Sequence, residues 1–386
     1  MKKLAIITSH PIQYNAPLFK ELAIRNNLAI KIFYTWSQAK KKVFDPGFGK
    51  QREWDIPLLE GYNYEFVENV SESPGSHHFK GIDNPILIKY IEQWGATEIL
   101  VYGWSFKSHL ECLRYFHKKI PVYFRGDSTL IDEKQGLNKI LRTVFLKWVY
   151  RYVDKAFYVG TLNKLYFLKH GLKESHLIFA PHAIDNNRFF DKEGIYTTNA
   201  LSWRRQLNID DSDLVFLFAG KLEPKKNPEL LIKAFLAIQR PGIHLMLVGN
   251  GILEKSLKEK YAKVSSLQFI DFQNQTMMPV VYRLGDVFVL PSSGPGETWG
   301  LAVNEAMACG KPVLVSDKCG CAVDLVENDK NGYVFTAQSK IDLTNKMQLC
   351  FENKNDLVKM GKLSMEKIKN WNFDAAASAI EMAVIN

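Results

Sequence analysis

The stretch that decides the fold spans residues 286–305 and reads DVFVLPSSGPGETWGLAVNE. It opens with an apolar run typical of a buried strand, continues as a glycine-rich loop and enters a helix pattern near Leu301. Backbone N–H groups and the helix dipole at such a junction bind anions. We therefore predict a diphosphate at the amides of Gly300 and Leu301, with Glu297 and Glu305 on either side contacting a sugar hydroxyl and a ribose. From the spacing alone, the alternative is an exposed helix with a surface glutamate.

Short apolar runs alternate with helix patterns through both halves of the chain. Such alternation indicates parallel strands with helices on both faces of the sheet. The expected strands are Leu4–Thr8, Ala29–Tyr34, Glu98–Tyr102, Pro121–Phe124, Lys155–Val159, Leu214–Phe218, His244–Val248, Leu267–Ile270, Val287–Leu290, Val313–Ser316 and Gly332–Phe335. We predict an α/β protein of two doubly wound domains, each with its strand C-termini directed at a shared cleft.

The length of 386 residues also favours two domains over one. We interpret the polar stretch Asp185–Asn208 as the linker between them. Residues 36–80 are less regular and are interpreted as long loops or an insertion.

Five cysteines and a net charge of +9 narrow the function classes. Cys319-Gly320-Cys321 has no second cysteine pair, so we expect free thiols in a cytoplasm instead of a zinc site or disulfides. No apolar run is long enough to span a bilayer, and the first one stops at Thr8, which favours a strand over a signal peptide. The positive charge suits anionic lipid or phosphorylated substrates, and nothing resembles a nucleic-acid-binding module.

The segment Lys134–Lys155 is basic and amphipathic. Its cations and apolar residues are Lys139, Arg142, Lys147, Arg151 and Lys155 among Leu137, Ile140, Leu141, Val144, Phe145 and Trp148. One interpretation is a helix with its apolar face in the domain core and its charges in solvent. The other is peripheral docking to an anionic membrane surface.

Three lysines follow an expected strand at the start of the second half, in Gly220-Lys221-Leu222-Glu223-Pro224-Lys225-Lys226. In a doubly wound domain they lie at the strand ends, beside a helix that begins at Pro228. Lysine binds phosphate as a point charge, so two of them can neutralise a diphosphate leaving group without a metal. A solvated basic turn is the alternative.

Gly249 and Gly251 form a glycine turn between an expected strand and an expected helix. A dinucleotide motif needs a third glycine at position 254, where this chain has Glu254. An NAD site is therefore not predicted, although the turn allows the backbone to approach a nucleotide.

Taken in order, these motifs resemble the retaining glycosyltransferases of family 4, which have the GT-B fold. The matching residues are Gly220-Lys221-Leu222 with Lys226, the Gly249–Gly251 turn, Tyr282, Asp286–Ser292, Glu297, Gly300-Leu301 and Glu305–Val313. The resemblance implies two Rossmann-like domains facing a central cleft. These are an acceptor domain at residues 1–187 and a nucleotide-sugar donor domain at residues 188–371, with a last helix at residues 372–386 packing back on the first.

The family's residue roles carry over to the matching positions. Lys221 and Lys226 would hold the donor diphosphate and stabilise it as it leaves, and Glu297 would contact the transferred sugar. The remaining donor contacts would come from Glu305 at the ribose, Trp299, Gly300, Leu301, Gly249, and Phe272 near the base. The resemblance implies catalysis without a metal or cofactor, in which the leaving phosphate takes the acceptor proton.

The first half departs from the family pattern. His10-Pro11-Ile12-Gln13-Tyr14-Asn15 replaces the usual glycine pair after the first strand, and Arg125-Gly126-Asp127 replaces the usual histidine. Acceptor candidates at strand ends are His10, Gln13, Tyr14 and His109, and Asp127 is the catalytic candidate of this half. A capping or packing role is the alternative for each.

The expected function is transfer of a hexose-type unit from a nucleotide-diphosphate sugar, UDP- or GDP-linked, to a glycan or lipid-linked acceptor. The expected setting is bacterial surface polysaccharide synthesis, in the cytoplasm or at the inner face of the plasma membrane. One alternative is a GT-B hydrolase or epimerase that turns over the donor without acceptor. Another is a silent scaffold that only binds nucleotide or glycan.

Overall fold

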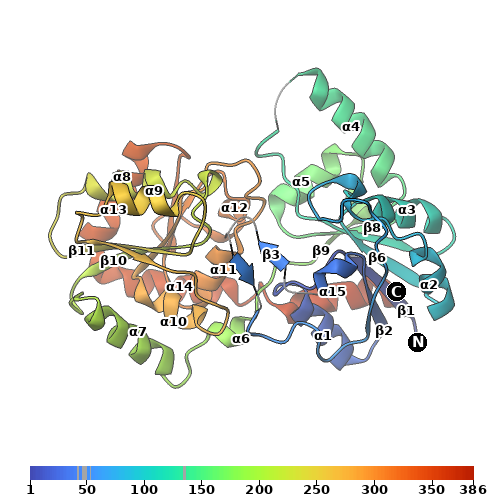
Figure 1. Cartoon of the computed structure of the whole chain (residues 1–386), viewed down its shortest axis with the longest axis horizontal. Helices are drawn as coiled ribbons and strands as arrows, with labels where there is room; N and C mark the ends of the chain where they lie inside the picture. The colour runs from blue at the N-terminus through green and yellow to red at the C-terminus, as the bar shows by residue number, and fades with distance from the viewer. Residues whose placement is uncertain (41–42, 46–49, 53, 134–135) are drawn as a thin grey trace. The chain divides into compact units, whose positions relative to one another are not determined.

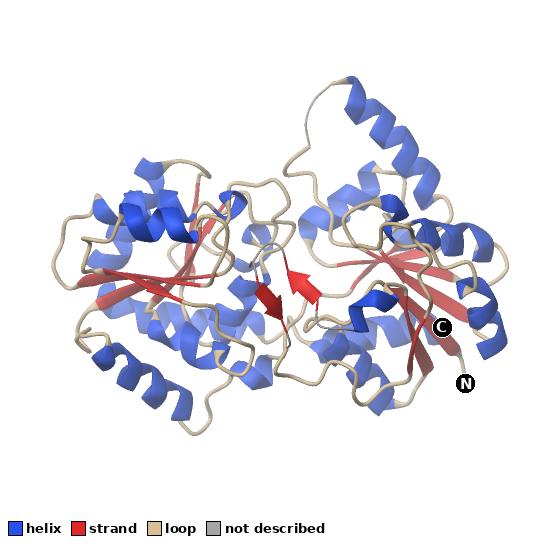
Figure 2. Cartoon of the chain, in the orientation of Figure 1, coloured by secondary structure: helices blue, strands red, loops and turns tan. Residues whose placement is uncertain are grey.

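The computed structural model of the chain describes residues 1–40, 43–45, 50–52, 54–133 and 136–386. The chain divides into two units, coloured along the sequence in Figure 1. The first unit contains Met1–Val43, Ile56–Ala183 and Phe373–Asn386, and the second contains Phe44–Asp55 and Ile184–Asn372. Figure 2 shows strands at the centre of each unit with helices around them.

Seven parallel strands form the sheet of the first unit, in the order β5-β2-β1-β6-β7-β8-β9. Their bounds are β1 Lys3–Thr8, β2 Ala29–Tyr34, β5 Tyr64–Phe66, β6 Glu98–Tyr102, β7 Val122–Arg125, β8 Lys155–Tyr158 and β9 Leu177–Phe179. Ala5 and Ile7 of β1 belong to one hydrophobic core, and Leu4 and Ile6 belong to another. Both faces are thus buried, which explains why this strand is apolar throughout.

Residues 36–80 contain more regular structure than the sequence indicated. β5 joins the edge of the first sheet, and a separate two-stranded sheet pairs β3 Val43–Asp45 with β4 Lys50–Arg52. The interpretation of this whole stretch as loops was therefore wrong for β5, whose pairing with β2 depends on a neighbour about thirty residues away in the chain.

The helices of the first unit cover both faces of its sheet. Their bounds are α1 Ala16–Arg25, α2 Leu87–Trp94, α3 Lys107–Phe116, α4 Leu137–Tyr150, α5 Thr161–Lys169 and α15 Phe373–Ile385. α1 and α15 contribute to one core, and α2 to α5 contribute to the other. α15 comes from the far end of the chain, and the hydrogen bonds that hold it include one from Tyr123 Oη to the Ala383 carbonyl at 2.6 Å and one from Arg25 Nη1 to Glu381 at 3.0 Å.

Six parallel strands form the sheet of the second unit, in the order β12-β11-β10-β13-β14-β15. Their bounds are β10 Leu214–Ala219, β11 Ile243–Val248, β12 Leu267–Ile270, β13 Val287–Leu290, β14 Val313–Ser316 and β15 Gly332–Phe335. The helices are α6 Asn186–Phe189, α7 Ile195–Gln206, α8 Pro228–Leu236, α9 Glu254–Lys260, α10 Met278–Leu284, α11 Leu301–Ala308, α12 Ala322–Leu325, α13 Lys340–Glu352 and α14 Leu357–Ile368. The predicted pair of doubly wound parallel α/β units is confirmed.

The stretch Asp185–Asn208 is not the plain linker predicted from its polarity. It forms α6 and α7, and Ala200 and Arg204 of α7 are buried. Arg204 accounts for part of the apparent polarity, because its guanidinium pairs with Asp286 at 3.2 Å and donates to the Asp213 carbonyl at 2.7 Å. Asp286 lies 82 residues away in the sequence, so composition alone indicated a solvated segment.

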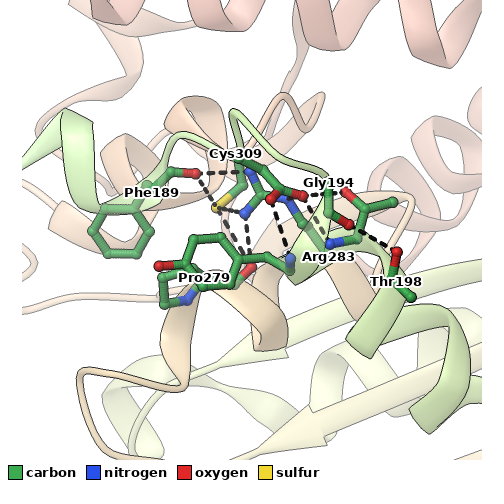
Figure 3. Close-up of polar contacts among 9 residues, drawn as sticks. Phe189, Gly194, Thr198, Pro279, Arg283 and Cys309 are labelled. Carbon is green, nitrogen blue, oxygen red and sulfur yellow. Dashed lines mark hydrogen bonds and ion pairs between the residues drawn. The ribbon is translucent and has the colours of Figure 1, made fainter.

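Arg283 of α10 fastens the chain segment after α6 to the rest of the second unit (Figure 3). Its guanidinium donates to the carbonyls of Phe189 at 2.7 Å and Pro279 at 2.8 Å, contacts Cys309 Sγ at 3.2 Å, and lies 3.5 Å from Asp191. One buried side chain therefore joins α6, α10 and α11.

The core-helix interpretation of the basic segment was wrong for most of its apolar residues. Lys134 lies outside the described residues. In α4, only Leu146, Val149 and Tyr150 are buried, whereas Leu137, Ile140, Leu141, Val144 and Phe145 are exposed.

The five cysteines are free and buried, as the expectation of free thiols required. Across the described ranges, no helix has the length and apolarity needed to cross a membrane.

Candidate functional site

The strand order of the second sheet creates a ligand-binding position. From β10 the chain moves outward through β11 and β12, then returns to the other side of β10 with β13. Doubly wound sheets bind ligands at this kind of reversal, outside the carboxyl ends of the strands. Residues 220–227 follow β10 and residues 291–300 follow β13, so the lysines and the glutamate loop share this edge.

Lys226 and Glu297 form an ion pair at this edge although they are 71 residues apart in sequence. Glu297 is buried, and its Oε2 also accepts a hydrogen bond from Ser292 Oγ at 2.9 Å. Ser292 is itself held, because Ser316 Oγ donates to its backbone carbonyl. The cation and carboxylate therefore have fixed positions set by β10, β13 and β14.

Helix α11 begins directly beside this pair. Gly300 is its N-cap residue with φ +99°, and a Cβ there would lie 2.9 Å from Leu290 Cδ2 and 3.6 Å from Glu297 Oε1. Only glycine fits this left-handed, crowded position. Within the described residues no side chain caps α11, and the first N–H groups of any helix lack partners within it. The dipole and these amides give Gly300-Leu301 the groups that favour an anion at a helix N-terminus.

Trp299 and Glu305 are fixed by neighbouring side chains. The indole Nε1–H of Trp299 donates to Asn304 Oδ1 at 2.9 Å, and its ring packs 4.9 Å from that of Trp371. Glu305 is buried and accepts a hydrogen bond from the Tyr282 hydroxyl at 2.6 Å. The buried carboxylate of Glu305 is thereby oriented on the same short helix whose N-terminus faces the ion pair.

A second glycine turn lies at the ends of β11 and β12. Gly249 has φ +135°, and a Cβ there would lie 2.1 Å from the Gly220 carbonyl, so the approach of the two chain segments requires glycine. Asn250 joins the same ends: Nδ2 donates to Glu254 at 2.9 Å and Asp271 at 3.0 Å, and Oδ1 accepts from the Phe272 N–H at 3.0 Å. The backbone at Phe272 is thus positioned from β11, and Lys221 follows Gly220 at this edge.

The segment Cys319–Cys321 braces the glutamate loop through its backbone. The Gly320 N–H donates to the Glu297 carbonyl at 3.1 Å, and the Cys321 N–H donates to the Trp299 carbonyl at 3.0 Å. Burial raises the pKa of the Cys319 thiol to about 12, with the Glu297 charge adding to the effect. Both thiols are therefore protonated packing groups at neutral pH. The described residues contain no group of three or more His, Cys, Asp or Glu side chains arranged to hold a metal ion.

The first sheet has the same kind of reversal, between β1 and β6, and His10 follows β1. Its Nδ1 lies 2.9 Å from Ser9 Oγ, and its ring meets that of Trp36 edge-on at 5.2 Å. Burial lowers the pKa of His10 to about 4, so the ring is neutral at pH 7. Gln13 and Tyr14 are half-buried in the turn before α1.

His109 is placed differently from the other acceptor candidates. It is fully buried, with Nε2 2.9 Å from Thr35 Oγ1 and Nδ1 3.0 Å from the Tyr102 carbonyl. Burial lowers its pKa to about 4. These contacts tie α3 to the ends of β2 and β6, which favours the packing alternative for His109.

Asp127 interacts with Arg125 and His182, which lie at the ends of β7 and β9. Arg125 is buried and donates to the carbonyls of Ala180 and Pro181, each at 3.0 Å. Burial lowers the pKa of His182 to about 4; Asp127 acts in the opposite direction and Arg125 in the same direction. His182 is therefore neutral at pH 7 within the field of both charges.

The structure adds three positioning side chains to those chosen from the sequence: Ser292, Asn250 and Tyr282. Each is buried and contacts a carboxylate or an amide of the site. Ser292 lies two residues after β13, Asn250 lies between two glycines, and Tyr282 is part of the family resemblance, so their positions carried a signal. The remaining candidates divide by unit: Lys221, Lys226, Glu297 and the donor residues belong to the second, and His10, Gln13, Tyr14, His109 and Asp127 to the first.

Residues 200–366 match the model of a protein family described as Glycosyl transferases group 1. Similar curated proteins include a D-inositol 3-phosphate glycosyltransferase of Gordonia bronchialis, 25% identical over 191 residues that cover 46% of this chain and 41% of that protein. An uncharacterized glycosyltransferase of Methanocaldococcus jannaschii is 30% identical over 136 residues, or 34% of each chain. The chain thus spans less than half the length of these relatives.

Solved structures resemble the whole chain. HepE of Anabaena in complex with UDP and glucose has a TM-score of 0.73 at 17% identity and covers 100% of both chains. Sucrose-phosphate synthase from Thermosynechococcus elongatus scores 0.74 at 17% identity, covering 99% of this chain and 98% of that one. WaaG, a glycosyltransferase involved in lipopolysaccharide biosynthesis, scores 0.67 at 15% identity with the same coverage. The likeness establishes the GT-B fold.

Proposed function

We propose that this chain, whose residues 200–366 match the model of glycosyl transferases group 1, is a retaining glycosyltransferase of family 4. It moves a sugar from a nucleotide-diphosphate sugar to a glycan or lipid-linked acceptor. The observation that carries the proposal is the ion pair of Lys226 with the buried Glu297, next to the N-terminus of α11, which no side chain of the described residues caps. A cation, a helix N-terminus and an oriented carboxylate at one strand edge suit a diphosphate joined to a sugar.

In this proposal each donor group has a place in the second unit, which acts as the donor domain. The diphosphate lies between the amides of Gly300 and Leu301 and the ammonium groups of Lys221 and Lys226. Glu297 contacts the transferred sugar, and Glu305, oriented by Tyr282, accepts from the ribose hydroxyls. Trp299 supports the loop, while the backbones at Gly249 and Phe272 adjoin the nucleoside. UDP- and GDP-sugars are the proposed donors, and the UDP and glucose bound by HepE support the first of these.

The proposed chemistry needs no metal or other cofactor. The bond between the anomeric carbon and the phosphate oxygen breaks, and its electron pair stays on the phosphate. Lys226, Lys221 and the dipole of α11 stabilise that developing charge. The acceptor oxygen bonds to the same face of the anomeric carbon, and the leaving phosphate takes the acceptor proton, so the anomeric configuration is retained.

The first unit is proposed to bind the acceptor. His10, Gln13 and Tyr14 are the acceptor candidates near the end of β1, and Asp127 is the catalytic candidate of this unit. Because His10 is neutral at pH 7, it can accept or donate a hydrogen bond to a sugar hydroxyl. Bacterial surface polysaccharide synthesis in the cytoplasm is the proposed setting, with peripheral contact to the inner membrane face. The role of WaaG in lipopolysaccharide biosynthesis supports it.

The test is a thermal-shift and nucleotide-release screen with UDP-, GDP-, ADP- and TDP-sugars. A donor at about 100 times its Kd adds ~2.7 kcal/mol to the free energy of unfolding. The proposal expects one donor to stabilise the protein and to release nucleotide slowly until an acceptor is added. Rapid release without acceptor would indicate a hydrolase or epimerase, and the absence of any shift would indicate a scaffold; either result would overturn the proposal.

A further inference from the structure

Helix α4 carries an apolar face that its own unit does not cover. Leu137, Ile140, Leu141, Val144 and Phe145 are between 40% and 79% exposed. With about 3.6 residues per turn, these spacings put all five side chains on one side of the helix. Figure 1 shows the helix projecting from the rest of the first unit. Scattered exposed apolar residues are ordinary, but a continuous stripe of this size marks a contact surface.

The opposite side of α4 anchors it firmly. Leu146, Val149 and Tyr150 are buried in the core formed with α2, α3 and α5. The exposed stripe therefore lies on a helix whose other side already packs in the core of the unit. Phe145 extends the stripe toward the end of β6, because its ring meets that of Trp104 edge-on at 5.3 Å.

The charges around the stripe indicate what kind of partner binds it. Residues 136–151 contain no Asp or Glu, and they carry Lys139, Arg142, Lys147 and Arg151. Lys139 turns toward Glu133 at 3.3 Å, whereas the other three are exposed. By helical spacing, Arg142 and Lys147 flank the stripe on opposite sides. An apolar strip edged by cations matches the acyl region and headgroups of an anionic bilayer.

We propose that the exposed face of α4 docks the first unit onto an anionic lipid bilayer. This rests on the proposed function, and it narrows the acceptor to a lipid-linked one presented at that surface. The helix has 14 residues, or about 21 Å, so it lies along the membrane and does not cross it. A second copy of the chain fits less well, because pairing two such faces would bring like charges together.

Vesicle binding tests the proposal with lipids of known composition. The full chain is mixed with vesicles of phosphatidylcholine alone or with added phosphatidylglycerol, and the bound fraction is measured by co-sedimentation. Binding is expected only with the anionic lipid and is expected to weaken as salt is raised from about 0.1 M to 0.5 M, since the Debye length shrinks. Equal binding to both lipids, or none to either, would overturn the proposal.

Two variants separate the apolar and charged contributions. Leu141→Gln/Val144→Gln removes two exposed side chains and should lower vesicle affinity about tenfold or more. Arg142→Gln/Lys147→Gln should lower it about fivefold for each charge removed. Ile341→Gln/Val358→Gln is the matched control and should bind like the wild type. Ile341 on α13 is 75% exposed and Val358 on α14 is 70% exposed. If all three variants bind alike, α4 is not the docking surface.

Two further measurements distinguish a failure of the docking proposal from a failure of the proposed function. Donor-induced thermal shift reports on the second unit and should be the same in all variants, so its absence from the wild type would count against the function alone. Sedimentation velocity reports on self-association. If the wild type forms a dimer that Leu141→Gln/Val144→Gln abolishes, the occupant is a second copy and the bilayer proposal is wrong.

Discussion

Single residues at the edge of the second sheet have roles that can be measured separately. Glu305 is the clearest case. Its carboxylate is oriented by Tyr282 and contacts the ribose in the proposed complex. We predict that Glu305→Ala raises donor KM about tenfold or more with little change in kcat, because a hydrogen bond to a charged group is lost in both ground and transition states. Tyr282→Phe, which keeps the carboxylate but removes its orienting hydroxyl, should raise donor KM less. An unchanged KM in Glu305→Ala would reject the ribose role.

Cys319 offers a test of how tightly the glutamate loop is packed. Its pKa is raised from 9.0 to about 12 by burial, so the folded protein keeps a proton that the unfolded chain loses above pH 9. The stability due to this thiol is therefore complete below pH 9 and is lost progressively up to about pH 12. We predict that iodoacetamide at pH 8 does not label Cys319 until urea unfolds the protein, as measured by mass spectrometry. Labelling of the native protein at the rate of a free thiol would show that the loop opens.

Much of the site was predictable at the residue scale, because short motifs that follow parallel strands lie together at the carboxyl edge of the sheet. Lys226 and Glu297 were chosen from separate motifs, and the structure brings them into contact. The hydrogen bond from Ser292 to Glu297 was not predictable, because it depends on a rotamer within one loop. The burial of His109 was not predictable either, since its partners Thr35 and Tyr102 come from other strands.

At the scale of elements, the contacts of α10 hold the second unit together around Arg283. Its guanidinium satisfies the Phe189 carbonyl and pairs with Asp191 in a buried setting (Figure 3). We predict that Arg283→Ala lowers the free energy of unfolding by about 3 kcal/mol, because the Phe189 carbonyl loses its donor and Asp191 is left with its hydrogen bonds from Tyr196 and Thr197. Arg205→Ala, which removes an exposed pair with Asp211, should lower the free energy of unfolding much less, because solvent screens an exposed pair. Urea unfolding compares the two, and equal effects would contradict the assignment.

The elements themselves show where sequence reasoning works. The strand Val287–Leu290 has the predicted bounds and the helix Leu301–Ala308 begins at the predicted residue, because a fully buried strand and a helix after glycine are strong local signals. Helix α7 was missed because burial of Arg204 is decided by Asp286, a distant partner. The pattern of α4 left open whether its apolar face packs in the core or docks to a membrane, because periodicity specifies that a helix has an apolar side without specifying what covers it.

At the scale of the whole molecule, the chain leaves the first unit and returns to it at its end. α15 packs against α1, where Arg25 contacts Asp374, Ser378 and Glu381. We predict that deleting residues 373–386 speeds hydrogen exchange in α1 and β2, because their apolar partners and the Arg25 ion pairs are removed, and leaves α10 and β13 unchanged. Met382→Gln, at an exposed position of the same helix, is the control. Equal loss of protection in both units would contradict this division.

The central claim is that Lys226 stabilises the leaving diphosphate, and the most direct measurement is the rate of nucleotide release during transfer, using the donor and acceptor that the screen identifies. The account predicts that Lys226→Ala lowers kcat on the order of 10²-fold or more. Lys225→Ala, which changes the neighbouring lysine near Glu223, should stay within about twofold of the wild type, because an exposed pair of this kind contributes little. A Lys226→Ala enzyme that releases nucleotide at the wild-type rate would contradict the account.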